Sequence, residues 1–174
     1  MAVTFSDITK KKDKVTVEEC FEVFDNLGAI TPDFLVGYRW KGWEFNTGHP
    51  LNGALETVGW YGKEFYDENN GQPLLLYSDN EKLDDQLWPI YPPTLFQIPV
   101  TGETPDRSEH EAKASQCRLK SILHRDVVTA SMFYDENPVN DTFRKVDQDT
   151  VMGIMDNKHI PLPYFFVLER AKKL

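Results

Sequence analysis

The stretch Trp40-Lys-Gly-Trp-Glu-Phe-Asn-Thr-Gly-His-Pro50 decides the expected fold, together with Gly59-Trp-Tyr-Gly-Lys-Glu-Phe65 shortly after it. Tryptophan next to glycine in an alternating run is typical of a strand in which a large ring packs over closely approaching backbone. Side chains of a strand alternate between its two faces, so Trp40, Gly42 and Glu44 share one face. The sequence therefore predicts a strand over residues 38–45 that ends in a turn at His49.

Short runs with strand chemistry and intervening turn signals fill most of the remaining chain. In the first half we expect strands over 60–66, 73–77 and 94–100, with Asn69-Asn70-Gly71 as a hairpin turn. In the second half the expected strands are 117–124, 127–135, 142–146, 150–156 and 164–169. This spacing is typical of an antiparallel barrel or sandwich.

Helices are expected near the N-terminus. Thr16 and Glu19 form a capping-box signature, and apolar residues at helical spacing predict a helix over 16–27. Pro32 suggests a second, short helix. We expect these two helices to form a lid or plug for the sheet.

Length and composition predict a single closed domain. We expect a flexible arm over residues 1–15 and one domain over 16–174, with halves at about 20–77 and 115–170. The polar segment 101–114 is expected to be an exposed loop or the start of a short helix. Aromatic residues make up 13% of the chain, which fits either an aromatic-lined interior or a ring-rich core.

The net charge of −9 disfavours nucleic acids and membrane surfaces as partners, because an acidic surface repels phosphate groups. No apolar run approaches the roughly 18–20 residues of a membrane helix, and no signal-peptide pattern is visible. We therefore expect a cytoplasmic protein. The sequence does not indicate the oligomeric state.

These residues resemble a known family. The first half is similar to the small domain named for its G-x-W-x-G motif, and the second half to the domain of unknown function that usually accompanies it. The matching residues are Trp40-Lys-Gly42, Glu44, Thr47-Gly-His-Pro50, Trp60-Tyr-Gly-Lys63, Phe65, Thr129-Ala130, Tyr134-Asp135, Pro138, Asp141, Phe143-Arg-Lys-Val-Asp147, Gly153-Ile-Met-Asp156 and Phe166-Val-Leu-Glu-Arg170. Tyr38 stands where the family has its first glycine, and Asp126 where a turn glycine is expected.

The resemblance also implies a fold. A glycine and a tryptophan at this spacing look like the opening of lipocalin-type barrels, which hold one small apolar ligand. The expected fold is therefore mainly β: a single antiparallel lipocalin-like (calycin-type) β-barrel with short N-terminal helices. Some fungal members of the family are associated with natural-product pathways, which implies a cyclase or isomerase role.

Four residues are candidates for catalysis: Glu44, His49, Lys63 and Asp141. An inward Glu44 is either protonated, through a raised pKa, or held in an ion pair with Lys63, Arg118 or Arg144. His49 is either a general acid or base at the barrel mouth, or an imidazole that holds the turn. Asp141 is either an inward acid or a cap that fixes Arg144.

Ligand binding is predicted for Trp40, Trp60, Tyr134, Arg118 and Arg144. Aromatic rings of this kind stabilise cationic character in a bound substrate. A phenol such as Tyr134 donates to a ligand oxygen, or merely packs.

No metal and no cofactor are expected, because the sequence lacks metal-ligand spacing, a P-loop, a G-x-G-x-x-G motif and a G-x-S-x-G elbow. The first hypothesis is a cofactor-independent cyclase or isomerase that acts by acid–base catalysis on an apolar, oxygenated natural product. The alternatives are a carrier for a lipid or other small hydrophobic molecule, and an interaction module with a filled barrel.

Overall fold

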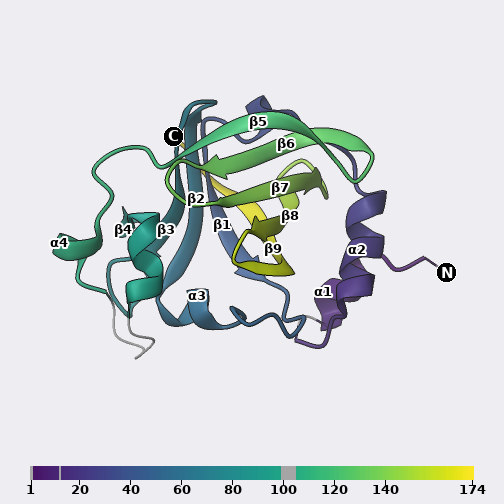
Figure 1. Cartoon of the computed structure of the whole chain (residues 1–174), viewed down its shortest axis with the longest axis horizontal. Helices are drawn as coiled ribbons and strands as arrows, with labels where there is room; N and C mark the ends of the chain where they lie inside the picture. The colour runs from purple at the N-terminus through teal and green to yellow at the C-terminus, as the bar shows by residue number, and fades with distance from the viewer. Residues whose placement is uncertain (1, 12, 99–104) are drawn as a thin grey trace.

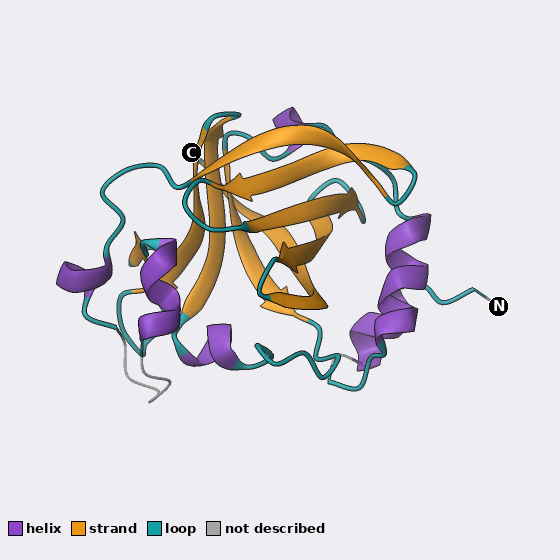
Figure 2. Cartoon of the chain, in the orientation of Figure 1, coloured by secondary structure: helices purple, strands orange, loops and turns teal. Residues whose placement is uncertain are grey.

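The computed structural model describes residues 2–11, 13–98 and 105–174, and within them the dominant element is one antiparallel sheet (Figures 1 and 2). Its strands are β1 (Tyr38–Glu44), β2 (Trp60–Asp67), β3 (Asn70–Tyr77), β4 (Leu87–Pro89), β5 (Cys117–His124), β6 (Val127–Tyr134), β7 (Val139–Lys145), β8 (Thr150–Asn157) and β9 (Ile160–Lys173). The helices are α1 (Phe5–Lys11), α2 (Val17–Asn26), α3 (Ala54–Thr57), α4 (Arg107–His110) and the 3₁₀ helices η1 (Pro32–Phe34) and η2 (Pro92–Gln97). The predicted class, mainly antiparallel β with short helices, is confirmed.

The sheet curves into a ring. Its strand order is β2-β1-β9-β8-β7-β6-β5-β3-β4, and a further pairing of β2 with β3 closes the ring, while β4 pairs with β3 outside it (Figure 2). The contact between β3 and β5 is narrow, since the paired residues there are Gly71 and Cys117. The ring therefore encloses an interior whose weakest seam lies between these two strands.

Alternation along the strands produces two apolar layers. Trp40, Phe143 and Phe166 belong to the layer inside the ring. Phe165 and Val167 alternate with Phe166 on β9 and belong to a second layer, which they share with residues of α1 and α2. Burial of both faces explains why the middle of β9, Tyr164–Leu168, is a continuous apolar run rather than an alternation of apolar and polar residues.

Glycine and tryptophan pack together as the opening motif predicts. A Cβ atom on Gly42 would lie 2.3 Å from the Trp60 ring, so the ring occupies the space that only a glycine leaves. The Trp40 ring lies fully buried and its Nε1–H donates to the Leu35 carbonyl at 3.0 Å. Trp40 and Gly42 face inward as expected.

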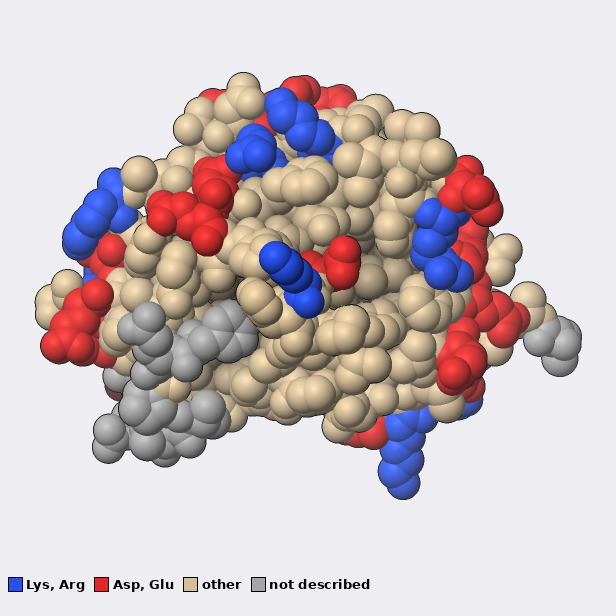
Figure 3. Space-filling view, viewed as in Figure 1, with Lys and Arg blue, Asp and Glu red and all other residues tan. Residues whose placement is uncertain are grey.

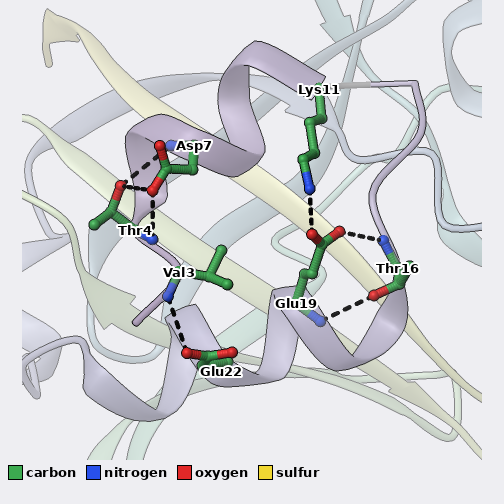
Figure 4. Close-up of polar contacts among 7 residues, drawn as sticks. All are labelled: Val3, Thr4, Asp7, Lys11, Thr16, Glu19 and Glu22. Carbon is green, nitrogen blue, oxygen red and sulfur yellow. Dashed lines mark hydrogen bonds and ion pairs between the residues drawn. The ribbon is translucent and has the colours of Figure 1, made fainter. Parts of the chain in front are cut away.

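The N-terminal segment differs from the predicted flexible arm. Residues 5–11 form α1, whose Ile8 is fully buried beneath α2 and β8–β9. Figure 4 shows how polar contacts join the two helices: Glu19 binds both Thr16, in the predicted capping box, and Lys11. A flexible arm was predicted because this short helix has few apolar residues and lysines follow them directly in the sequence.

The first of the two predicted helices does not form a lid or plug, whereas Ile30 and Leu35, on either side of the second, pack into the inner layer of the ring. The apolar face of α2 packs against the outer layer of β8 and β9, through Cys20, Val23 and Phe24 (Figure 1). The predicted helix over 16–27 itself is confirmed as α2, and the second one as η1. A cover over one end of the ring comes instead from the segment around α3.

The predicted strand over 94–100 is wrong in its described part, where two prolines begin the 3₁₀ helix η2 instead. Pro99 and Val100 lie outside the described residues, as do residues 101–104 of the expected loop. The described remainder of that segment contains α4.

Acidic and basic side chains are interspersed on the face shown in Figure 3. Several ion pairs of the described residues are at least partly exposed, among them Arg118–Asp135 and Arg125–Asp25. None of the helices in the described part of the chain is long and apolar enough to cross a membrane.

We expect Gly42→Ala to lower the free energy of unfolding by about 1–3 kcal/mol, because the added methyl group collides with the Trp60 ring. Urea denaturation followed by circular dichroism measures the change. Gly28→Ala is the matched control: its Cβ would meet only the Lys145 side chain, at 4.0 Å, and we expect a change within about 0.5 kcal/mol. Equal stability of the two variants would contradict this packing.

Candidate functional site

An apolar cavity of about 180 Å³ lies at one end of the ring interior. Strands β3 and β6–β9 supply its walls, and residues around α3 and η2 cover it. Its lining consists of Leu51, Ala54, Leu55, Val58, Leu74, Pro92, Leu95, Ile98, Tyr134, Asn137, Val139, Met155, Asn157 and Tyr164. Polar atoms therefore reach the cavity from only a few side chains of this lining, chiefly the two tyrosines and two asparagines.

A buried ion pair lies beside the cavity. The Lys63 ammonium and Asp141 Oδ2 are 2.8 Å apart, and their side chains are 3% and 2% exposed. Lys63 also donates to the Pro73 carbonyl at 2.9 Å, and its Nζ lies 5.2 Å from the centre of the Phe166 ring. Burial raises the pKa of Asp141, although the charge of Lys63 and its hydrogen bond oppose that rise.

The second oxygen of this carboxylate has no partner. Asp141 Oδ1 is buried and accepts no hydrogen bond from the described residues. A carboxylate with a buried, unpaired oxygen is costly unless something else satisfies it. Among the described residues, Asn137 Oδ1 on the cavity lining and His49 Nε2 are likewise buried without a hydrogen-bond partner.

Tyr134 stands between the ion pair and the cavity. Its ring centre lies 5.6 Å from Lys63 Nζ, and the exposed part of its surface faces the cavity. Burial raises the pKa of Tyr134 well above its usual value, and the nearby Asp141 raises it further. The phenol therefore stays protonated, and its hydroxyl makes no hydrogen bond with other described side chains, so it can donate to a ligand.

Glu44 and His49 fix the cover of the cavity. Glu44 accepts a hydrogen bond from the Tyr164 hydroxyl through Oε2, and one from the Gly53 N–H at 2.6 Å through Oε1. His49 packs edge-on against Tyr164, with ring centres 5.2 Å apart, and its Nδ1 accepts from the Leu51 N–H at 3.1 Å. Both side chains therefore hold the segment that carries α3 against the ring.

Burial also sets the charge state of these groups. It lowers the pKa of His49, while the Leu162 backbone and the Glu44 charge oppose that change. His49 Nε2 lies near the Leu162 backbone but makes no hydrogen bond of good geometry with the described residues. Burial and Glu44 together raise the pKa of Tyr164. At neutral pH the turn is therefore held by a neutral imidazole and an undissociated phenol.

The structure brings together only part of the predicted site. Lys63, Asp141 and Tyr134 form one cluster, and Glu44 and His49 meet at Tyr164. The alternative in which Glu44 pairs with a cation is wrong, because Lys63 pairs with Asp141, Arg118 pairs with Asp135, and Arg144 donates to backbone carbonyls. Their roles in catalysis stay predictions.

The other four predicted ligand-binding residues lie elsewhere or act indirectly. Trp40 and Trp60 belong to the packed interior and do not line the apolar cavity. Trp60 nevertheless lies near the buried ion pair, since its ring centre is 5.8 Å from Lys63 Nζ. Arg118 is on the surface and pairs with Asp135. Arg144 points outward under α2, where it donates to the Leu27 and His124 carbonyls. For both arginines the predicted ligand contact is wrong, because alternation turns their side chains away from the interior.

Sequence reasoning missed Tyr164, Asn137 and Asn157. Tyr164 was recoverable, since it alternates with Phe166 and Leu168 on β9. Asn137 and Asn157 lie at turns, where asparagine usually has a local role, so nothing in the sequence marked them as cavity residues. Within the described residues, His, Cys, Asp and Glu form no group of three that could hold a metal ion.

Two known domain families match this sequence. The family described as "GXWXG protein" matches residues 22–81, and the one described as "Domain of unknown function (DUF4334)" matches residues 115–170. The chain belongs to the family that combines these two domains. In this member of the GXWXG family, both domains contribute strands to one ring, and Lys63 and Asp141 come from different domains.

One solved structure resembles this GXWXG-family chain along nearly its whole length. It is described as the crystal structure of a protein from Thermomonospora curvata, with 30% sequence identity and a TM-score of 0.71. The alignment covers 96% of this chain and 95% of that one. No curated protein matches the sequence at a significant level.

Asp141→Asn should lower the free energy of unfolding by about 3–5 kcal/mol, because it leaves the Lys63 ammonium buried without a counter-charge. Asp135→Asn is the control, since it removes the same charge from the half-exposed pair with Arg118 and should cost no more than about 1 kcal/mol. Chemical denaturation measures both. Similar losses of unfolding free energy in the two variants would contradict the burial of the Lys63–Asp141 pair.

His49 should make stability depend on pH. Its pKa in the folded state lies below the ordinary value of 6.5, so the unfolded chain takes up the proton first as the pH falls. Stability is thus complete above pH 6.5 and decreases as the pH falls through the window between 6.5 and the folded pKa, by at most about 1.4 kcal/mol per pH unit.

The comparison of urea unfolding between pH 5 and 8 for wild type and His49→Asn isolates this contribution, since Asn can still accept from the Leu51 N–H. The variant should show a flatter profile. His159→Asn, which changes an exposed histidine, should reproduce the wild-type profile. An unchanged slope in His49→Asn would contradict the assignment.

Proposed function

We propose that the ring is a lipocalin-like (calycin-type) barrel, and that the protein is a cofactor-independent isomerase or cyclase for a small, apolar, oxygenated molecule held in its cavity. The observation that carries the proposal is the position of Tyr134 on the lining of a mostly apolar cavity, with the buried Lys63–Asp141 pair directly behind it. Perturbed titratable groups beside a concave apolar pocket are the usual signature of an acid–base site. A cytoplasmic location stays a prediction.

The cavity limits the size of the substrate. An engineered cavity of 150 Å³ accommodates benzene. A cavity of about 180 Å³ is only slightly larger, so the part of a substrate that it encloses is a compact group of roughly seven or eight non-hydrogen atoms. Its walls exclude water from most of the substrate surface, which strengthens every electrostatic interaction inside.

Asp141 is the proton carrier in this proposal. Burial makes its carboxylate a stronger base than an exposed aspartate, and Lys63 fixes Oδ2 so that Oδ1 remains available. Asp141 takes a proton from one position of the substrate and returns it at another. The bonding pairs shift within the substrate, so the product is an isomer and the enzyme is regenerated.

Tyr134 polarises the substrate. Its undissociated hydroxyl donates a hydrogen bond to a substrate oxygen, where it stabilises negative charge as the proton leaves. The Trp60, Phe166 and Tyr134 rings surround the Lys63 ammonium and keep it in place by cation–π attraction. Glu44 and His49 act indirectly, since they position Tyr164 and the α3 segment.

The alternative function is a carrier for a small hydrophobic ligand. The predominance of aliphatic side chains in the cavity lining favours it. In a carrier, the ligand is released unchanged and Asp141 serves only to close the barrel. The two functions therefore differ in whether a substrate proton exchanges with solvent.

Deuterium transfer tests this difference without knowledge of the natural substrate. The protein is incubated in D₂O with compact unsaturated alcohols and ketones, such as carveol and carvone, and with any apolar compound that co-purifies with it. Mass spectrometry of the extracted compounds should show deuterium bound to carbon in at least one of them, at ten or more times the rate in buffer.

Tyr134→Phe and the paired change Lys63→Met with Asp141→Asn should abolish this incorporation, whereas Asp135→Asn should retain it. The paired change keeps shape and removes both charges, so the barrel is expected to stay folded. Tight binding with no carbon-bound deuterium would reject the enzyme in favour of the carrier.

A further inference from the structure

We propose that the cavity selects an uncharged hydroxyl compound, whose oxygen accepts from the Tyr134 hydroxyl and whose O–H donates to Asp141 Oδ1. This inference rests on the proposed function, because it names the substrate class of the same site. It explains how a buried carboxylate can keep one oxygen without a protein partner.

Asp141 is placed to receive such a donor. It lies on β7 two residues after Val139 and opposite Met155 of β8, and both of these side chains line the cavity. Tyr134 and Tyr164, which also line it, are close enough to Asp141 for its charge to act on their hydroxyls. Asp141 therefore lies directly behind the residues that line this part of the cavity, with Oδ2 turned to Lys63 and Oδ1 buried without a protein partner.

The charges of the site reject an anionic ligand. The ammonium of Lys63 is already balanced by Asp141 and donates to the Pro73 carbonyl. The lining itself contains no charged side chain among the described residues. A carboxylate ligand would thus lie beside the Asp141 charge with no cation of its own, and burial of such a charge is strongly unfavourable.

A ketone satisfies only half of the site. Its oxygen accepts from Tyr134, but it has no proton for Asp141 Oδ1, and that oxygen stays buried and unpaired. Sites built to pair with a hydroxyl discriminate strongly against analogues that lack it, for this reason. We expect the alcohol to bind at least ten times more tightly than the ketone of the same skeleton.

Isothermal titration calorimetry with matched probes tests the selection at two sizes. The smaller set is cyclohexanol, cyclohexanone and cyclohexanecarboxylate, and the larger set is menthol, menthone and 4-isopropylcyclohexanecarboxylate. In at least one set the alcohol should bind best, the ketone ten or more times more weakly, and the carboxylate not detectably.

Two variants assign the selection to the named groups. Lys63→Met combined with Asp141→Leu removes the acceptor together with its counter-charge, and should reduce the alcohol-to-ketone ratio to about one. Tyr134→Phe should weaken both ligands by a similar factor and leave the ratio unchanged. Asp135→Asn, a change to a half-exposed pair on the surface, should bind like wild type.

The outcomes separate this inference from the proposed function. A ketone or carboxylate that binds as tightly as the alcohol overturns the inference and leaves a ligand cavity in place. An alcohol preference that survives in a folded Lys63→Met/Asp141→Leu protein also overturns it. Failure of all six probes to bind overturns both the inference and the proposed function.

Discussion

The arrangement of this structure depends on one ion pair held inside an apolar ring. Lys63 on β2 and Asp141 on β7 meet across the interior, where both side chains are almost fully buried. Two charges in such a place require each other, because either one alone would lack compensation for its lost hydration. Since β2 belongs to the GXWXG half and β7 to the companion half, the pair links the two domains across the ring.

The same constraint shapes the site. Lys63 takes one oxygen of Asp141 and leaves the other free, while the surrounding rings keep water away from the pair. Tyr134 lies beside this ion pair and also lines the cavity, so it places a polar hydroxyl group between the two. Glu44 and His49 act at a separate point, where they fasten the α3 segment over the cavity. Polarity in the interior is thus concentrated beside one wall of an otherwise apolar space.

Much of the scaffold was predictable from local physics. The capping box of Thr16 fixed the start of α2, and turn residues marked most hairpins of the second half. Alternation placed Trp40, Gly42 and Glu44 on one face of β1 because extended backbone allows nothing else. Alternation also places Arg144 and Asp141 on opposite faces of β7. It does not show which of the two faces is the interior, because α2 buries the outer face as well.

The site was less predictable because it depends on irregular and distant contacts. The pairing of β2 with β3 shifts register near Gly62, so Tyr61 joins an outer cluster while Lys63 turns inward, against strict alternation. The partner of Lys63 lies on a strand far along the chain, and no local pattern identifies it. Leu95 and Ile98 reach the cavity from a segment that carried no helical or functional signal.

The most direct measurement of the central claim is a high-resolution crystal structure of the protein with menthol or cyclohexanol bound. We expect an alcohol oxygen inside the ring, within hydrogen-bond distance of both Asp141 Oδ1 and the Tyr134 hydroxyl, and an intact Lys63–Asp141 pair. A ligand oxygen bound elsewhere, or an Asp141 Oδ1 that faces side chains rather than the ligand, would contradict it.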